Sequence, residues 1–288
     1  MTTPLLRSCF VLAGLVTATG LWAQAPKLEI PAPSPAGVVK QRVGVTDIEI
    51  DYSRPSARGR KVFGGLVPFD EVWRTGANNA TKLILSTPAK FNGTEVPAGK
   101  YELFTIPGRT EWTFIIHKDM SEWGAYTYDP KNDVARVTAK PEALAQSVES
   151  FAIGINDLRD ESATLNLMWE NTRVPLKITV DVVSLVVPQI EAAMASADAK
   201  KFYVPAAMFY LEHGIELPKA LGWMDAAIAA DPNAFYFVYR KALIQEKMGD
   251  KAGAIATARA SIEGAKKAGG AVRDEYIRLN EALIERLQ

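Results

Sequence analysis

The period of the hydrophobic pattern changes near residue 181, and this change constrains the fold more than any other feature of the sequence. From about residue 38 to residue 180, short apolar runs are separated by turn residues, as in β-strands. Beyond that point Ala, Leu, Glu and Lys dominate and β-branched residues become rarer, as in helices. A chain of 288 residues is long enough for two cores. We therefore expect an α+β multidomain protein, with a β-domain over residues 38–181 and an all-α region over residues 184–288.

The first part carries clear strand and hairpin signals. Apolar and acidic residues alternate from Asp47 to Tyr52, which predicts a strand with one buried and one wet face. Asn92-Gly93 favours a tight hairpin, because both residues tolerate positive φ. Further strands are expected at residues 82–86, 101–106, 112–117, 134–139, 150–155, 163–169 and 174–180. Short strands at this spacing predict an antiparallel β-sandwich, with a barrel as the alternative.

The second part is expected to be a series of short helices. Their predicted ranges are Pro188–Ser196, Ala199–His213, Pro218–Ala230, Ala234–Met248, Lys251–Lys267 and Val272–Leu287. Small residues recur at an offset of 34 residues, with Ala220 matching Ala254 and Ala227 matching Ser261. In these features residues 199–267 resemble the tetratricopeptide repeat, although the tryptophan and tyrosine positions of that repeat are not recovered. The resemblance implies paired helices with a surface that docks a protein partner.

The N-terminus has the pattern of a signal peptide. Arg7 precedes an apolar run over residues 10–22, and Ala23-Gln24-Ala25 supplies small residues where a signal peptidase cleaves. We expect cleavage after Ala25 and a periplasmic or secreted protein, with a retained anchor as the alternative. The signal peptide would then be residues 1–25, followed by a proline-rich leader over residues 26–37. No other stretch is apolar enough to span a membrane.

Charge and histidine content narrow the function classes. Lys plus Arg and Asp plus Glu each number 33, so no bulk field favours nucleic acid. His117 and His213 are the only histidines, and they fall in different predicted domains. We therefore predict no metal site and no cofactor. A Ser-His-Asp set would have to be built on His117, which we expect to be a solvent-facing residue at a strand end.

Residues 51–81 show neither strand nor helix periodicity and predict a long ordered loop, a kind of segment that is often functional. The tentative ligand-binding residues, including one carboxylate from a later strand, are Arg54, Arg58, Arg60, Trp73, Arg74, Thr75, Asn78 and Glu170. Arginine forks bind carboxylate or phosphate in a bidentate manner, so one hypothesis is an anion site. In the alternative, Arg54 and Arg74 make buried ion pairs that fasten the loop, and Trp73 fills the core. The acidic partners of those ion pairs would be Asp51, Asp70, Glu71 or Glu170.

Four aromatic residues near the predicted hairpin give a second hypothesis. This hairpin covers residues 101–117, and the four aromatic residues on or beside it are Trp112, Trp123, Tyr126 and Tyr128. Exposed aromatic rings bring large flat contact areas at low entropy cost, which suits a sugar ligand. The alternative is that Trp112 and Trp123 pack in the core or at its rim.

Several unusual sequence motifs in and after the loop resemble those of one bacterial family, called domain of unknown function 2911. These motifs are Asp51–Pro55, Gly59–Gly64, Val72–Asn78, Pro97–Tyr101, Phe104–Pro107, Trp123–Tyr126, Ala163–Leu165 and Trp169-Glu170. The resemblance covers about residues 35–180. It implies an exported β-rich domain and brings no assigned activity.

From these patterns we expect an exported cell-envelope protein that binds or scaffolds, with an anion or sugar site at residues 51–81 and a protein-docking helical tail. The alternative is a hydrolase-type enzyme that uses the loop arginines and a carboxylate such as Glu170 or Asp51. The scarcity of histidine and cysteine favours the binding protein.

Overall fold

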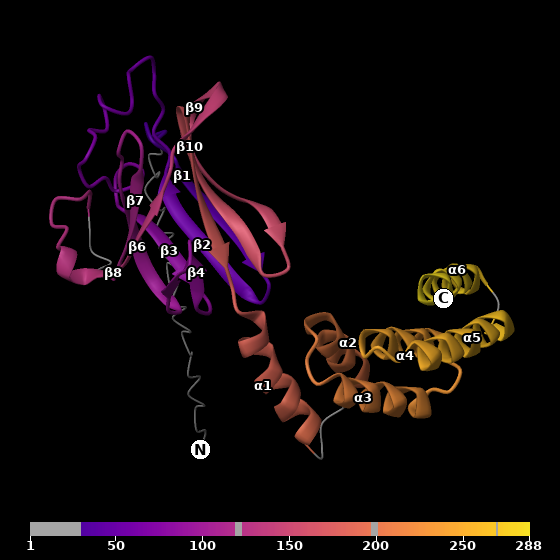
Figure 1. Ribbon diagram of the computed structural model, residues 1–288. Coiled ribbons are helices and arrows are strands. Elements are labelled where there is room, and N and C mark those ends of the chain that lie inside the picture. The colour runs from indigo at the N-terminus through magenta and orange to yellow at the C-terminus, as the bar shows by residue number, and fades with distance from the viewer. Residues whose placement is uncertain (1–29, 119–122, 197–200, 269) are drawn as a thin grey trace, which may run out of the picture.

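The computed structural model describes residues 30–118, 123–196, 201–268 and 270–288. The expected signal peptide lies outside these residues, as do residues 26–29 of the expected leader. Two antiparallel sheets come first and six helices follow within the described ranges, so the predicted α+β layout is confirmed (Figure 1).

The first sheet has six antiparallel strands in the order β1-β2-β3-β6-β7-β8. Their bounds are β1 Ala36–Val43, β2 Thr46–Ser53, β3 Thr81–Leu85, β6 Gly99–Ile106, β7 Trp112–His117 and β8 Asp133–Ala139. The predicted alternation in β2 is confirmed, because Ile48, Ile50 and Tyr52 are buried between less buried neighbours. β1 begins at Ala36, two residues inside the expected leader.

The second sheet has four antiparallel strands in the order β5-β4-β10-β9. Their bounds are β4 Ala89–Phe91, β5 Thr94–Val96, β9 Glu142–Arg159 and β10 Ser162–Thr179. Asn92 and Gly93 join β4 to β5 with φ of 44° and 87°, which confirms the predicted tight hairpin. The two sheets do not close on each other, so the barrel alternative is wrong.

β9 and β10 are longer than the sequence pattern predicts. Residues 163–169 and 174–180 were expected as separate strands, yet β10 runs through both at 18 residues. Its register shifts around Glu170, where φ is 47°, so a bulge interrupts the alternation without ending the strand. The first half of β9 is polar and mostly exposed, and for that reason it carries no alternating hydrophobic signal.

The facing sides of the two sheets enclose one hydrophobic core. Its largest fully buried side chains are aromatic and aliphatic residues from both sheets, among them Trp112, Trp169, Phe91, Phe114 and Phe151. Burying such side chains is the dominant stabilising contribution in a domain without disulfides.

The helices are α1 Val182–Ala195, α2 Tyr203–His213, α3 Leu217–Ala230, α4 Phe235–Lys247, α5 Lys251–Ala268 and α6 Ala271–Leu287. The last four agree closely with the predicted ranges. α1 begins six residues before the predicted Pro188, which lies inside the helix instead of starting it. The carboxylate of Asp181 accepts hydrogen bonds from the Ser184 N–H at 2.9 Å and from its hydroxyl at 2.7 Å, and this N-cap sets the start.

Consecutive helices of the tail pack against each other, and four small residues lie at the buried contacts. Ala220 and Ala227 of α3, and Ala254 and Ser261 of α5, are at most 5% exposed. These are the residues that recur at the offset of 34. The tetratricopeptide-like arrangement stays a prediction.

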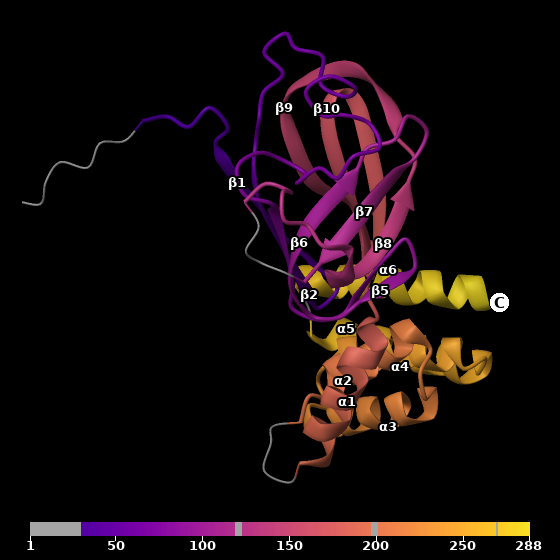
Figure 2. The same cartoon turned by 90° about the vertical axis from the view of Figure 1, so that its left-hand side faces the viewer.

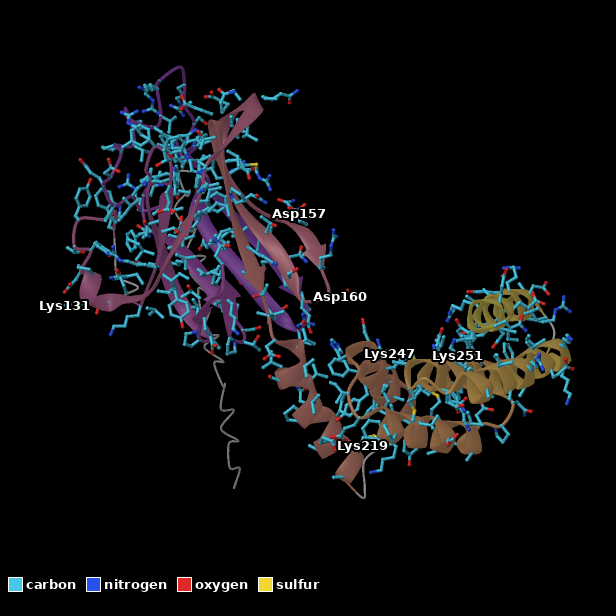
Figure 3. The ribbon with its side chains drawn as sticks, in the orientation of Figure 1. Lys131, Asp157, Asp160, Lys219, Lys247 and Lys251 are labelled. Atoms are coloured by element: carbon cyan, nitrogen blue, oxygen red, sulfur yellow. The ribbon has the colours of Figure 1, made fainter. Side chains whose placement is uncertain are left out.

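The loop between β2 and β3 and the helices lie at opposite ends of the sandwich in both views (Figures 1 and 2). α1 continues from the end of β10 away from the sheets. In Figure 3, Asp160 marks the β9–β10 turn on the side of the helices, whereas the loop crowds the other end. None of the helices in the described part of the chain combines the length and apolar character needed to cross a bilayer.

Candidate functional site

The loop over residues 54–80 is ordered because its backbone pairs with both sheets. Ser56 bridges Ser150 of β9, where the two hydroxyl oxygens are 2.7 Å apart. On the other sheet Trp73 bridges Thr105 of β6, with N–H to O distances of 2.7 and 2.9 Å. Backbone groups buried by a loop need such partners. The loop therefore closes one end of the sandwich by joining its two layers.

A cluster of aromatic rings joins the loop to the core of the sandwich. Phe63 and Trp73 of the loop contact Trp112 of β7, Phe151 of β9 and Trp169 of β10. The closest ring centroids, those of Phe63 and Trp112, are 4.9 Å apart, and Trp73 stacks on Trp169 at 6.0 Å. Aromatic pairs at such distances add about 0.5–1.5 kcal/mol each beyond area burial. Trp73 is half-buried and packs against the core, and the rest of its side chain lines a pocket.

Three of the candidate arginines bind backbone carbonyls. The Arg54 Nε donates to the Phe151 oxygen at 3.1 Å, and an Arg58 Nη donates to the Pro33 oxygen at 3.1 Å. Arg60 donates to the Ala57 and Ser56 oxygens at 3.0 and 2.8 Å. These bonds fasten turns of the loop, and they leave the three guanidinium groups apart from each other.

The ion-pair hypothesis for the loop is wrong within the residues that the structure describes. Neither Arg54 nor Arg74 lies within ion-pair distance of a carboxylate there. Glu170, an expected partner, instead accepts a hydrogen bond from the Val62 N–H at 3.1 Å. Main-chain hydrogen bonds and aromatic packing hold the loop, and a buried ion pair would have carried a large desolvation penalty.

A pocket of about 300 Å³ opens between the loop and the end of the sandwich. Its wall consists of Ser34, Pro55, Arg60, Leu66, Val67, Pro68, Glu71, Val72, Trp73, Arg74, Gly76, Ala77 and Trp169. Three of the candidate residues therefore meet here, namely Arg60, Trp73 and Arg74. The volume lies at the lower end for ligand pockets, and the mixture of indole, aliphatic and charged groups is typical of them.

Arg74 is the least satisfied charged group of this wall. Its side chain is half-buried, and its Nε is sealed from solvent without a hydrogen-bond acceptor among the described residues. A buried donor without a partner costs about 1–3 kcal/mol. The backbone around it is fixed, because the Arg74 oxygen accepts from the Thr81 N–H at 3.1 Å and the preceding residue pairs with Thr105. The backbone at Arg74 is thus held in place, and no carboxylate of the described residues forms an ion pair with its guanidinium.

Thr75 keeps the chain at Arg74 in a strained turn. It is fully buried and has a φ of 54°, which is rare for a β-branched residue. Its hydroxyl lies 3.1 Å from that of Thr105, and its carbonyl accepts from the Thr81 hydroxyl at 2.7 Å. Strained backbone of this kind collects at binding sites, where it fixes a neighbouring side chain. Thr75 therefore positions Arg74 and is too buried to contact a ligand itself.

Asn78 lies on another side of the loop. Its amide donates to the Ser53 hydroxyl at 3.2 Å and to the Ser34 oxygen at 3.4 Å. It lines a second, separate pocket of about 280 Å³ together with Asp51 and Asn79. The convergence of Arg54, Arg74 and Asn78 with a carboxylate, on which the hydrolase-type alternative depends, is not formed by these residues.

His117 is fully buried, so the expectation of a solvent-facing histidine is wrong. It lies on the outer side of the first sheet under a cover of residues 123–128, between the rings of Phe104 and Tyr128 at 5.5 and 5.3 Å. Its Nε2 is 3.1 Å from the Asp129 oxygen. The sequence suggests that His117, at a strand end, is exposed, because the residues that cover it belong to a later irregular segment.

Tyr128 closes the edge of that cover through a polar network. Its hydroxyl lies 2.7 and 2.9 Å from the Asp133 carboxylate oxygens and 2.6 Å from an Nη of Arg136. Burial, followed by the hydrogen bond to Asp133, raises the pKa of Tyr128 to about 12. The neutral phenol is therefore the form that this network favours.

The aromatic residues considered for sugar binding separate into two groups. Trp112 is 2% exposed and belongs to the core, as its alternative role predicted. Trp123 and Tyr126 are 66% and 76% exposed, and their rings stack with centroids 5.8 Å apart. This exposed stacked pair lies beside Arg74, as described below.

Two further features of the described residues bear on function. They contain no group of three or more His, Cys, Asp or Glu side chains that could hold a metal ion. The helical tail has an apolar groove of about 430 Å³ between α1 and α2, which includes the exposed Phe202.

Glu71 and Trp169 of the pocket wall were not among the predicted ligand-binding residues. The stacking of Trp169 on Trp73 joins residues far apart in the chain. Periodicity within one segment carries no signal of such a contact.

Two facing antiparallel sheets, closed at one end by a loop that bears a pocket, define a β-sandwich domain. The chain belongs to the family described as Protein of unknown function (DUF2911), which matches residues 34–178. The predicted family resemblance is thereby confirmed, and the match contains the entire pocket wall from Ser34 to Trp169. Neither the curated proteins nor the solved structures gave a match to this chain.

Proposed function

We propose that this protein is a non-enzymatic binding protein of the cell envelope, and that its sandwich domain holds a small carboxylate- or phosphate-bearing molecule in the pocket at the loop. The observation that carries the proposal is Arg74, a half-buried guanidinium in the pocket wall without an acceptor for its Nε among the described residues. An oxyanion in the pocket would place a negative charge beside this guanidinium, and a charge-assisted hydrogen bond is about twice as strong as a neutral one.

The rest of the wall supports a ligand that is small and partly apolar. The half-buried Trp73 offers indole surface, and Arg60 adds a second positive charge at the rim. Glu71 opposes highly charged anions and favours a ligand with a single acidic group. The proposed export to the envelope rests on the signal-peptide pattern of residues 1–25. N-terminal sequencing of the protein isolated from cells tests it, and we expect the mature chain to begin at Pro26.

The proposal is tested by thermal unfolding and calorimetric titration of the full mature chain with inorganic phosphate, acetate and succinate. A ligand at 100 times its dissociation constant stabilises the folded state by about 2.7 kcal/mol, which raises Tm by several degrees. We expect the Arg74→Met variant to keep wild-type stability or exceed it, because it removes a buried donor without an acceptor. The same variant should lose at least tenfold in affinity for the anion.

Two further variants make the test specific. Arg58→Gln removes a positive charge from the exposed part of the same loop and should leave binding unchanged, because Arg58 is not in the pocket wall. Arg74→Lys keeps the charge but loses the planar fork, and should bind more weakly than wild type. Equal anion affinity in Arg74→Met and wild type, or no stabilisation of wild type by any of the three probes, would refute the proposal.

A further inference from the structure

The exposed stacked pair of Trp123 and Tyr126 is an unusual surface. Two large rings that are 66% and 76% exposed lie within two residues of a buried glycine and stack with an interplanar angle of 24°. Exposing two adjacent aromatic rings to water has a cost that folding does not recover. Such patches on soluble domains mark binding surfaces.

The pair is held rigidly by its neighbours. Trp123 forms an isolated antiparallel bridge with Asn79 of the loop. Ala125 and Tyr128 pack into a small cluster with Phe104 and Ile115 on the outer side of the first sheet. The bridge at Trp123 and the packing of Ala125 and Tyr128 restrain the backbone that carries the rings, so little conformational entropy is lost when a ligand covers them.

Gly124 brings the pair next to Arg74. A Cβ atom at Gly124 would lie 2.7 Å from the Tyr126 ring and 3.3 Å from Nη1 of Arg74. The tyrosine ring and the guanidinium are thus immediate neighbours across the glycine, whose φ of 85° is itself unfavourable for other residues. The aromatic surface and the pocket are consequently parts of one continuous site that shares Arg74.

The geometry decides what kind of flat ligand fits. Carbon atoms in contact are about 3.5–4.0 Å apart, so a base inserted between the rings needs about 7 Å between them, whereas their centroids are 5.8 Å apart. A ligand must lie on the outer face of the pair. The C–H face of a sugar ring suits such a one-sided platform, and a carboxylate on that sugar suits the adjacent guanidinium.

We propose that the site binds an acidic saccharide, with a sugar ring on the outer face of the stacked Trp123–Tyr126 pair and its carboxylate on Arg74. This inference rests on the proposed function and names its ligand class. It also accounts for the glycine between the rings, because any side chain at Gly124 would separate the platform from the charge.

The test is isothermal titration of the full mature chain with trigalacturonic acid, a hyaluronan tetrasaccharide and N-acetylmuramic acid. Fully methyl-esterified trigalacturonate is the matched neutral probe. We expect at least one acidic saccharide to bind wild type at least tenfold more tightly than its neutral counterpart. Trp123→Ala and Tyr126→Ala should each weaken binding at least tenfold, and Arg74→Met should abolish the preference for acid over ester. Phe202→Ala removes an exposed aromatic residue at the start of α2 and should change nothing.

The outcomes separate this inference from the proposed function. Phosphate or acetate binding that needs Arg74, together with no saccharide binding or with unchanged affinity in Trp123→Ala, overturns the saccharide and leaves the anion site. If saccharide binding needs Trp123 but the acid and the ester bind equally well, Arg74 does not recognise the carboxylate. That result overturns the role of Arg74 in this inference and in the proposed function. Tighter binding of uridine monophosphate than of every saccharide would assign the platform to bases and also overturn the inference.

Discussion

Arg74 differs from the other arginines of the loop, because its Nε has no hydrogen-bond acceptor among the described residues. Arg54, Arg58 and Arg60 donate hydrogen bonds to carbonyl oxygens of the loop and its surroundings. Arg74 projects from a strained, doubly paired backbone and has no acceptor for its Nε in the described part of the chain. A guanidinium that is held in place and lacks an acceptor is suited to bind a ligand, whereas one that donates to loop carbonyls stabilises the loop.

The polar network of Tyr128 makes a prediction about alkaline pH. The folded pKa of about 12 lies above the ordinary value of 10.0, so the neutral phenol is favoured in the folded state. Its contribution to stability is fully present below pH 10 and is lost as the pH rises toward 12. We expect Tyr128→Phe to lower stability at pH 8 and to flatten the fall in stability between pH 10 and pH 12. Denaturant unfolding across that range measures both effects.

A second tyrosine provides the matched control. Burial and a hydrogen bond to Glu191 also raise the pKa of Tyr210, in the helical tail. Tyr210→Phe should therefore change the alkaline transition of the helices and leave that of the sandwich as in wild type. An unaltered alkaline profile of the sandwich in Tyr128→Phe would contradict the assignment to Tyr128.

Residue types were easier to predict from the sequence than residue partners. Arginine, glycine and aromatic residues correctly marked an ordered loop, but it spans residues 54–80, because residues 51–53 belong to β2 and Thr81 to β3. The partners of Arg54 and Arg60 are main-chain carbonyls, which every residue possesses and which leave no mark in a sequence. Burial of His117 was missed for a related reason, because the segment that covers it has no periodicity.

At the scale of elements, the start of α1 depends on Asp181. Val182, Val183, Val186 and Val187 are β-branched and read as strand, so the sequence favoured a later start at Pro188. The cap formed by Asp181 and the packing of Val182 against the sandwich outweigh that preference. β2, which alternates, and β7, which is buried almost throughout, were predicted within two residues, whereas the bulged β10 was divided into two.

Asp181→Ala should destabilise the protein by about 1 kcal/mol, the typical cost of losing an N-cap. Asp181→Asn is the matched control, because asparagine caps a helix about as well and should stay within a few tenths of a kcal/mol. Hydrogen bonds from Ser184 hold the pKa of Asp181 below its ordinary value. The extra stability of the aspartate over the asparagine is thus present near neutral pH and is lost as the pH falls through the folded pKa. Equal stability of Asp181→Ala and wild type in urea at pH 7 would argue against the cap.

At the scale of the whole molecule, the sandwich and the helices have separate cores with a narrow junction. Val182 and Val186 of α1 and Phe209 of α2 pack against the sandwich core. Phe209 also packs against the core of the helices. His213 lies 3.7 Å from Glu161 at the β9–β10 turn and adds one polar contact to the junction.

Because the junction is narrow, we expect two unfolding transitions in calorimetry of the mature chain. Phe209→Ala should lower both midpoints, since the ring contacts both cores, at a cost of about 2 kcal/mol for a half-buried phenylalanine. Phe202→Ala is the control, because Phe202 is 52% exposed and belongs to neither core. A single transition that moves as one in Phe209→Ala would show that the two parts unfold together.

The bridge between Ser56 and Ser150 also has a consequence for the time course of biosynthesis. Its two residues are 94 positions apart, and Trp169 of the pocket wall is made later still. A growing chain that has completed the loop therefore lacks the Phe151 and Trp169 contacts of the aromatic cluster until β9 and β10 have been synthesised. The pocket, whose wall includes Trp169, is consequently a late product of folding.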